Sequence, residues 1–286
     1  MENKYCYTKV MILGSGKLAF QCAMEAWKYV EQIEVLEYKV TDSTILQKMC
    51  LKENIPYFFC EKQELSSRLR EEKEKTLVIS AGNTYLIPKD IIAKDNLTII
   101  NWHNALLPRH KGRNAEAWCI YEGDMLTGIT WHRIVEAVDA GDIIVQKEIP
   151  ISDTTTALGL FRKQCDLGAE VFAEIAESLL TDNCIFRKQE QGEEQIHFSY
   201  EVPGDGYLDI QWDYEKISCF LRAMDYGALQ LLGEMHVRWQ DKNYRFHKYK
   251  ITQATEEAEA VWLQEKELII CKDGHKIVLK GLEQAE

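Results

Sequence analysis

Three side chains of complementary chemistry lie close together in the middle of the sequence. Asn101 and His103 flank Trp102 at the end of an apolar run, and Asp139 opens the glycine-bearing stretch 139–142. An amide can donate a hydrogen bond to a developing oxyanion. An imidazole can share that role or move a proton, while a carboxylate can orient the ring and raise its basicity. The set suits transfer of an acyl group between nitrogens, with no metal and no covalent intermediate.

Each of these residues also has an ordinary structural interpretation. Asn101 could cap a turn, His103 could be hydrogen-bonded within a loop, and Asp139 could start an Asx-turn. Their positions favour a joint role, because alternation along a strand puts the first two side chains on the same side of the chain. In open α/β sheets ligands bind at the carboxyl ends of strands, which is where we expect residues 101–103. The turn at 139–142 lies between two strand-like runs and can fold back over His103.

The first two thirds of the chain alternates strand-like and helix-like segments. The apolar run 9–13, followed by Gly14-Ser15-Gly16, predicts a buried strand, a tight turn and the start of a helix. We expect further strands at 33–38, 76–80, 97–101, 128–135 and 143–149, and helices at 43–54, 63–74, 114–122 and 155–180. This order predicts the α/β class, with a Rossmann-like, mostly parallel sheet covered by helices.

The remainder of the chain has a different pattern. We expect a polar linker at 186–206 between a catalytic domain at 1–185 and a small, mostly β domain at 207–286. That domain should contain one helix at 214–226 and strands at 235–239, 244–252, 260–264, 267–271 and 276–279, arranged as a β-barrel or curled sheet. Its aromatic residues Trp239, Tyr244 and Phe246 can either finish its own core or pack against a partner, such as a second copy in a homodimer.

Composition excludes several classes of protein. The 34 basic and 46 acidic residues give a net charge of -12, which disfavours binding to nucleic acid or anionic lipid. The nine cysteines form no CxxC pair or Cys/His cluster, which argues against a disulfide framework and a zinc site. No stretch reaches the roughly 18 apolar residues of a membrane span. We therefore expect a soluble, cytoplasmic protein without a bound metal.

The stretch from Asn101 to Ile149 resembles the signature region of the folate-dependent formyltransferase superfamily. This superfamily includes glycinamide ribonucleotide, methionyl-tRNA and sugar-nucleotide N-formyltransferases. The matching motifs are Asn-x-His at 101–103, Leu-Leu-Pro at 106–108, Thr-Gly-Ile-Thr at 127–130 and Val-Asp-Ala-Gly-Asp-Ile-Ile at 138–144. The resemblance covers about the first 180 residues well, and residues 207–226 resemble the C-terminal barrel domain of larger members.

The resemblance implies a formyltransferase fold, with Asn101, His103 and Asp139 as the catalytic triad. It also implies 10-formyltetrahydrofolate as the formyl donor, with the pterin beside segments 83–88 and 136–142 and held largely by backbone groups. The candidate donor-binding residues are Asn83, Tyr85, Leu86, Ile87, Glu136, Val138 and Asp142.

The loop after Leu-Leu-Pro departs from the family pattern. The common Ser before this motif is Ala105, and the loop has an unusual Arg-His-Lys-Gly sequence at 109–112. These cationic residues could clamp a phosphate or a phosphopantetheine arm, or form a solvated loop. Lys17, at a helix start, would also suit an anion. The candidate acceptor-binding residues are Lys17, Arg109, His110, Lys111 and Arg113.

The turn at 14–19 also matches a weak dinucleotide-binding pattern, Gly-x-Gly-x-x-Ala. The acidic residue that such a site needs about twenty residues later is ambiguous between Glu34 and Glu37. A plain tight turn explains the glycines equally. Trp131 and His132, in the strand at 128–135, could face an acceptor pocket, but we expect Trp131 to be a core residue.

The acceptor amine is left open by the sequence. Residues 113–118 differ from methionyl-tRNA formyltransferases, and the acidic balance disfavours initiator tRNA. Residues 128–132 resemble formylation domains of peptide synthetases, so a carrier-tethered aminoacyl group and a nucleotide-linked amino sugar both remain. Two other functions are weighed against transfer: a formyltetrahydrofolate hydrolase, and a catalytically silent folate- or nucleotide-binding module.

Overall fold

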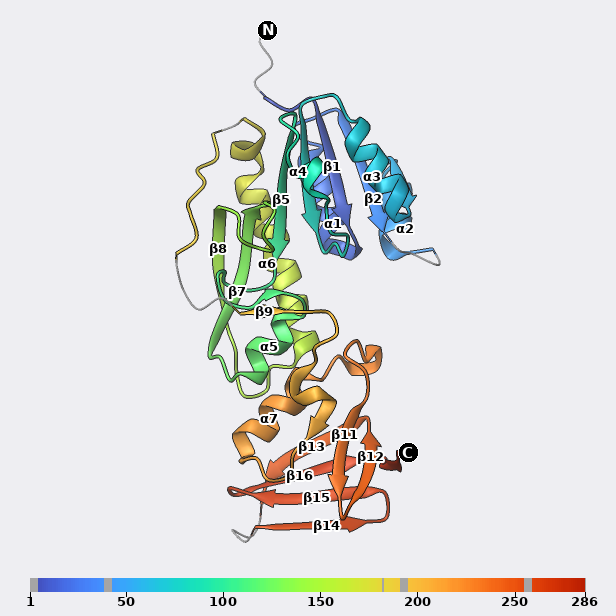
Figure 1. Cartoon of the computed structure of the whole chain (residues 1–286), viewed down its shortest axis with the longest axis vertical. Helices are drawn as coiled ribbons and strands as arrows, with labels where there is room; N and C mark the ends of the chain where they lie inside the picture. Colours follow the sequence, from blue (N-terminus) through green and yellow to red (C-terminus); the bar gives the residue numbers. More distant parts are fainter. Residues whose placement is uncertain (1–4, 39–42, 182, 191–194, 255–258, 286) are drawn as a thin grey trace. The chain divides into compact units, whose positions relative to one another are not determined.

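The computed structural model describes residues 5–38, 43–181, 183–190, 195–254 and 259–285. The chain divides into two compact units (Figure 1). The first comprises residues 1–111, 128–149 and 163–195, and the second comprises residues 112–127, 150–162 and 196–286. Each unit has sheets and an apolar core of its own.

The first unit is built on a seven-stranded sheet with the order β3-β2-β1-β4-β5-β7-β8. Its strands are β1 (Lys9–Gly14), β2 (Gln32–Tyr38), β3 (Tyr57–Cys60), β4 (Thr76–Ala81), β5 (Leu97–His103), β7 (Leu126–Arg133) and β8 (Ile143–Pro150). All neighbours from β3 to β5 pair in parallel, whereas β5 and β7 are antiparallel. The predicted mostly parallel sheet is confirmed, and the carboxyl ends of β1, β2, β4 and β5 lie along one edge.

Helices follow the strands, as the sequence predicts for α1 (Gly16–Ala26), α2 (Ile45–Lys52), α3 (Lys62–Glu71) and α6 (Ala157–Leu180). The short helix α4 (Lys89–Ile92) is absent from the predicted set. Strand β4 is buried at every residue, which explains its almost unbroken apolar sequence, since a parallel strand is covered on both faces. Helix α2 begins after Thr44, whose hydroxyl accepts a hydrogen bond from the backbone N–H of Gln47 at 3.0 Å.

Two strand predictions need correction. Strand β3 is absent from the predicted set, because four residues at a sheet edge give too short a pattern to stand out. The single strand expected at 244–252 is two strands in different sheets, β12 (Lys242–Phe246) and β13 (Lys248–Gln253). The chain changes sheets at His247, which a pattern of alternating apolar residues does not reveal.

The described residues of the second unit form two complete helices, the start of α6 and two four-stranded sheets. The helices are α5 (Ala115–Tyr121) and α7 (Tyr214–Ala223), with single turns at η1 (Pro203–Gly206) and η2 (Gly227–Leu229). One sheet has the order β10-β11-β12-β17 and the other β13-β16-β15-β14. The remaining strands are β6 (Lys111–Gly112), β9 (Ile196–His197), β10 (Tyr207–Leu208), β11 (Met235–Trp239), β14 (Ala260–Gln264), β15 (Glu267–Lys272), β16 (His275–Lys280) and β17 (Glu283–Gln284). These sheets match the expected mostly β character of the C-terminal part.

The core of the second unit accounts for the aromatic residues of its sheets. Phe246 is fully buried, and Trp239 and Tyr244 pack against the same apolar cluster. They therefore contribute to the core of this unit and give no support to a homodimer. The homodimer remains a prediction. None of the described helices is both long and apolar enough to cross a membrane. The predicted domain boundaries remain a prediction.

Candidate active site at the end of strand β5

The register of β5 and β7 brings a second histidine to the predicted site. Asn101 lies directly opposite His132 in this antiparallel pair, and His103 lies opposite Thr130. Opposed residues share a face of the sheet, so Asn101, His103 and His132 all point to the same side. The sequence suggests that His132 could face an acceptor pocket, but not that it lies beside Asn101. That position depends on the strand register, which the sequence alone does not supply.

A directed chain of hydrogen bonds fixes the Asn101 amide. The Ser80 hydroxyl donates to its Oδ1 at 2.7 Å, and its Nδ2 lies 3.2 Å from Nε2 of His132. Nδ1 of His132 lies 2.9 Å from the Arg133 carbonyl oxygen, which can only accept. In its neutral form the His132 ring therefore carries its proton on Nδ1 and accepts the Asn101 amide at Nε2. One amide hydrogen of Asn101 is used in this way, and the second is available for a substrate.

Asp139 lies between the two histidines. Its carboxylate oxygens are 3.5 Å from Nδ1 of His103 and 3.4 Å from Nε2 of His132. Nε2 of His103 lies 2.8 Å from the carbonyl oxygen of His110, so this nitrogen is the donor. Burial lowers the pKa of His103, and the carboxylate of Asp139 opposes the shift without reversing it. His103 is therefore neutral near pH 7, with Asp139 placed to stabilise its protonated form.

The loop that carries Asp139 is held against the end of β7. Asp139 has φ +46°, a left-handed conformation that Asp tolerates better than most residues. A side chain on Gly141 would meet the Arg133 carbonyl oxygen at 1.8 Å, so the close approach requires glycine there. The side-chain amide of Gln189 donates to the carbonyl oxygens of Asp139 and Gly141 at 2.7 and 2.8 Å. Gln189 falls in the predicted linker, where no local pattern marks a residue that supports the site.

The two predicted donor-binding segments lie side by side. Glu136 forms an ion pair with Lys89, directly after the segment 83–88. Asn83 folds its segment by bonding both backbone groups of Tyr85, and the Asp142 carbonyl oxygen accepts from the backbone of Arg133. The Tyr85 side chain is buried in the core, with Ile87 packed against the same cluster.

Two other predicted donor-binding residues have side chains in solvent. The exposed fractions are 80% for Leu86 and 46% for Val138. The side chain of Tyr85, by contrast, bonds to the Ser66 hydroxyl at 2.7 Å inside the core. Leu86 and Val138 can therefore present apolar surface to a ligand, whereas the Tyr85 side chain is held in the core.

The predicted acceptor-binding residues differ in exposure. Arg109 and Arg113 are exposed, but His110 and Lys111 are buried, which corrects the picture of a wholly solvated loop. The backbone N–H of Lys111 donates to the Gln195 carbonyl oxygen, so this part of the loop is fixed. Lys17 is exposed and forms an ion pair with Asp166 at 2.9 Å.

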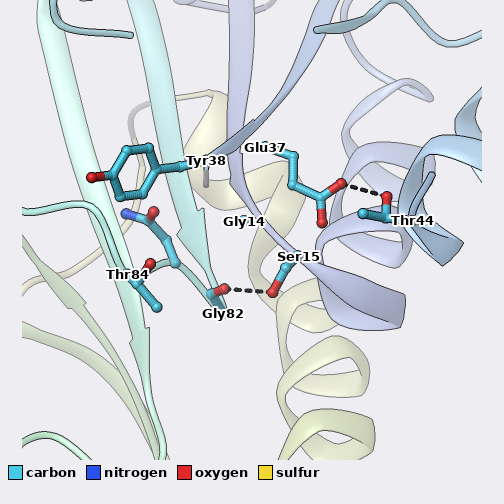
Figure 2. A pocket seen from close by; sticks show the side chains of 8 residues that line it. Gly14, Ser15, Glu37, Tyr38, Thr44, Gly82 and Thr84 are labelled. Atoms are coloured by element: carbon cyan, nitrogen blue, oxygen red, sulfur yellow. Dashed lines mark hydrogen bonds between the residues drawn. The ribbon is translucent and has the colours of Figure 1, made fainter. Parts of the chain in front are cut away.

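A pocket of about 330 Å³ opens at the carboxyl ends of β1, β2 and β4 (Figure 2). Gly14, Ser15, Glu37 and Thr44 line it, together with residues 82–84. The structure separates the two acidic candidates of the weak dinucleotide pattern, since Glu37 lines the pocket and Glu34 forms an ion pair with Lys9 at 2.8 Å.

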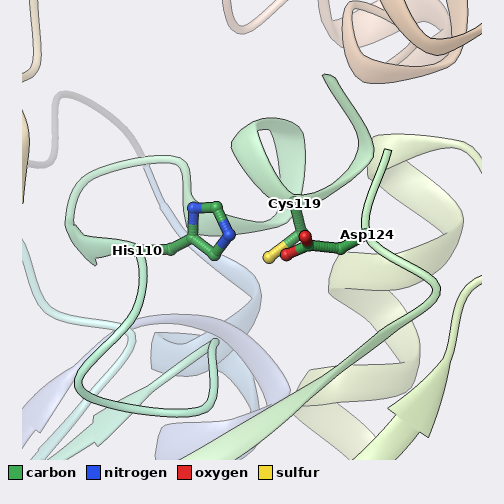
Figure 3. Close-up of side chains that lie close together, drawn as sticks. All are labelled: His110, Cys119 and Asp124. Carbon is green, nitrogen blue, oxygen red and sulfur yellow. The ribbon is translucent and has the colours of Figure 1, made fainter. Parts of the chain in front are cut away.

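Neither unit by itself brings three His, Cys, Asp or Glu ligand atoms together among the described residues. In the second unit, Cys119 is buried on α5, and its sulfur lies 3.1 Å from the hydroxyl of Thr127. Asp124 follows in the turn after α5 (Figure 3), where its backbone N–H donates to the Cys119 carbonyl oxygen. His110, also drawn there, belongs to the first unit. The expectation of a metal-free reaction remains a prediction.

Sequence relatives share this part of the chain. The GDP-perosamine N-formyltransferase of Brucella melitensis is 32% identical over 155 residues, which are 52% of this chain and 56% of that protein. The methionyl-tRNA formyltransferase of Lactobacillus johnsonii is 28% identical over 210 residues, 71% of this chain and 66% of that protein. The match to the first of these relatives thus spans little more than half of its length.

Solved structures share the fold at low sequence identity. The N-formyltransferase of Helicobacter canadensis, solved with folinic acid and dTDP-3-aminofucose, has a TM-score of 0.77 at 18% identity, covering 97% of this chain and 99% of that one. WlaRD, a sugar 3N-formyl transferase solved with dTDP and 5-N-formyl-THF, has a TM-score of 0.75 at 21% identity, covering 96% and 97%. The family model described as formyl transferase matches residues 13–175, more than half of the sequence. The chain therefore belongs to the formyl transferase family.

Proposed function

We propose that this chain transfers a formyl group from 10-formyltetrahydrofolate to the primary amine of a nucleotide-linked amino sugar. The observation that carries the proposal is the cluster at the end of β5, where the Asp139 carboxylate lies within 3.5 Å of both His103 and His132. Asn101 lies on the same face. The names of the relatives favour an amino sugar over a carrier-tethered aminoacyl group, because GDP-perosamine is an amino sugar linked to a nucleotide.

The reaction needs an oxyanion donor and a place for one proton. A bond forms between the acceptor nitrogen and the formyl carbon, and the bond from that carbon to the donor's nitrogen breaks. One proton leaves the acceptor amine, and one reaches the released donor nitrogen. In this proposal the second Nδ2 hydrogen of Asn101 stabilises the tetrahedral oxyanion, because the first is held by His132.

The pair of His103 and Asp139 handles the proton. Nε2 of His103 already donates to the His110 carbonyl oxygen, so Nδ1 is the nitrogen that can accept. Burial keeps the imidazole neutral before the reaction, since it lowers the pKa of His103. Asp139, 3.5 Å from Nδ1, then stabilises the imidazolium that forms until the proton passes to the leaving nitrogen.

The donor's pterin is assigned to the adjoining segments 83–88 and 136–142. Their ion pair between Lys89 and Glu136 keeps the two segments together. Leu86 and Val138 expose apolar side chains from them, which suits one face of an aromatic ring system. The backbone groups of the same segments supply hydrogen bonds, so a side-chain signature is not required.

The test is to follow the conversion of 10-formyltetrahydrofolate to tetrahydrofolate spectroscopically. Separate reactions contain nucleotide-linked amino sugars, aminoacyl carrier proteins, or no acceptor. We expect release of tetrahydrofolate only with an amino sugar nucleotide, and formation of its N-formyl product by mass spectrometry. Release that needs no acceptor would instead indicate the hydrolase, and no release under any condition would indicate a silent binding module.

A further inference from the structure

The pocket at the ends of β1, β2 and β4 is lined by a buried carboxylate, of which only one oxygen is bonded by other described residues. Glu37 is only 3% exposed. Its Oε2 accepts hydrogen bonds from the hydroxyls of Thr44 at 2.6 Å and Tyr57 at 2.8 Å. Among the described residues, nothing donates to Oε1 and no cation pairs with the group. Figure 2 shows this second oxygen turned away from Thr44, and Glu37 is part of the pocket wall.

Such a carboxylate is costly to bury unless its oxygens find donors. The two hydroxyls that hold Oε2 are fixed donors, since burial and the bond to Glu37 raise the pKa of Tyr57 to about 12. They fix the orientation of the carboxylate and leave Oε1 facing the pocket. A neutral ligand with hydroxyl groups would satisfy it, whereas an anion would be repelled from this end.

The start of α1, which follows the lining residues Gly14 and Ser15, attracts negative charge. Helix α1 has 11 residues, no acidic side chain in its first turn and no side-chain cap. The Ser15 hydroxyl, which stands at the cap position, donates instead to the Gly82 carbonyl oxygen at 2.8 Å (Figure 2). The first N–H groups of α1 are therefore not capped by it, and the helix dipole adds partial positive charge.

We propose that this pocket binds the ribose and the first phosphate of a ribonucleoside diphosphate, with Glu37 accepting from the 2′- and 3′-hydroxyls and the start of α1 holding the phosphate. The inference rests on the proposed function in taking this nucleotide to be the handle of the amino sugar acceptor. It narrows the acceptor to sugars linked to a ribonucleotide, because a 2′-deoxyribonucleotide offers Glu37 one hydroxyl in place of two.

The order of the strands indicates that the ligand extends from Glu37 on β2 toward Asn101 on β5. Along the sheet, β2 is followed by β1, β4 and then β5, each step being about 4.8 Å. The register puts Asn101 on β5 level with Leu36, the neighbour of Glu37, so the two strands are about 14 Å apart there. A diphosphate and a hexose lying over the carboxyl ends of the strands can bridge this span. The pocket wall also connects to the candidate catalytic amide, since Asn83 donates to the Ser80 hydroxyl, which donates to Asn101.

The experiment measures nucleotide binding to the full chain by isothermal titration calorimetry, without folate or amino sugar. Guanosine, uridine, adenosine and cytidine diphosphates are each compared with their 2′-deoxy forms. We expect at least one ribonucleotide to bind, and to bind about tenfold more tightly than its deoxy form. Equal affinity of the two forms, or no binding by any nucleotide, would overturn the inference.

Variants of the two acidic residues on β2, Glu37 and Glu34, test whether Glu37 causes the preference for the ribonucleotide. Glu37→Gln should weaken binding of the ribonucleotide about tenfold and remove the preference for it, because a charge-assisted hydrogen bond becomes a neutral one. Glu34→Gln, whose carboxylate pairs with Lys9, should change neither property. A ribose preference that survives in Glu37→Gln would also overturn the inference. Because no formyl transfer is measured, failure here leaves the proposed function standing.

Discussion

The two ends of the same sheet edge differ in how completely their polar groups are satisfied. At the β5–β7 end, Ser80, Asn101, a neutral His132 and the Arg133 carbonyl oxygen form a network in which the donor and acceptor of each hydrogen bond can be assigned, and the Asp139 carboxylate lies beside it. At the β1–β2 end, Glu37 has one oxygen held by two hydroxyls and the other facing a pocket. A closed network suits chemistry that needs fixed geometry. A half-satisfied group suits recognition, because a ligand completes it.

The largest expected effect would come from replacing either member of the proposed acid–base pair, His103 or Asp139. His103→Ala and Asp139→Ala should each lower kcat at least about a hundredfold, because each removes one half of the proton-handling pair. Binding of the folate donor, measured by fluorescence quenching, should be largely retained. The double variant should be little worse than either single one, since the two residues act together.

The control for this prediction is Glu148→Ala, which removes an exposed carboxylate from β8. Its kcat should stay within about twofold of the original, as for most surface substitutions away from a site. Near-normal turnover in either His103→Ala or Asp139→Ala would refute the role of the pair. Thermal unfolding of each variant by circular dichroism separates loss of catalysis from loss of fold.

A smaller effect is expected at His132, which orients Asn101 without belonging to the acid–base pair. His132→Phe removes the acceptor at 3.2 Å from the Asn101 amide, and kcat should fall about tenfold with both KM values nearly unchanged. His132→Gln offers the amide an oxygen acceptor again and should restore part of the loss. An unchanged kcat in the Phe variant would show that the amide is positioned without His132.

These residues also show what the sequence could and could not predict. The alternation that puts Asn101 and His103 on one face is local, and so is the glycine turn that exposes Asp139. The role of His132 depends on the register of β5 with β7, a contact between residues about thirty positions apart. Gln189 lies fifty residues from the carbonyl oxygen of Asp139 that it holds. Residues brought together over such distances leave no pattern in a single sequence.

The same distinction explains the fold and the pocket. The α/β order and most strands follow from apolar runs and glycine turns, whereas β3 has only four residues and β12 and β13 divide one continuous run. Sequence spacing left Glu34 and Glu37 equivalent as acidic partners of the glycine turn. Their hydrogen bonds and ion pairs separate them, and these depend on Lys9, Thr44 and Tyr57 in three other segments.

A pH-dependent loss of stability should accompany the buried imidazole of the closed network. In the unfolded chain His103 takes up a proton as the pH falls through about 6.5, whereas burial lowers its pKa in the folded state. Between the folded and the unfolded pKa of His103 the unfolded state binds more protons. The free energy of unfolding therefore falls by up to about 1.4 kcal/mol for each unit by which the pH is lowered in that range. Above pH 6.5 both states are neutral and this contribution is fully present.

Urea unfolding at pH 7.5 and pH 5.5 measures this contribution. The original protein should lose more stability between the two pH values than His103→Gln, which has no group to protonate at this position. Equal losses in the two proteins would show that His103 is not held neutral by the fold. Other groups titrate in both proteins alike, so the difference between the two losses isolates the imidazole.

The smallest expected effect concerns the β1–β2 end of the sheet edge, at the exposed ion pair of Lys17 and Asp166. The two side chains are 62% and 56% exposed, so Lys17→Ala should change the free energy of unfolding by less than about 1 kcal/mol. If the first turn of α1 holds a phosphate, the same change should raise KM for the acceptor several-fold, because a cation next to that turn is lost. Asp166→Asn keeps the cation and removes its competing carboxylate, so KM should stay equal or fall. A rise in KM of the same size in both variants would mean that the ion pair, rather than the charge of Lys17, supports this end of the sheet.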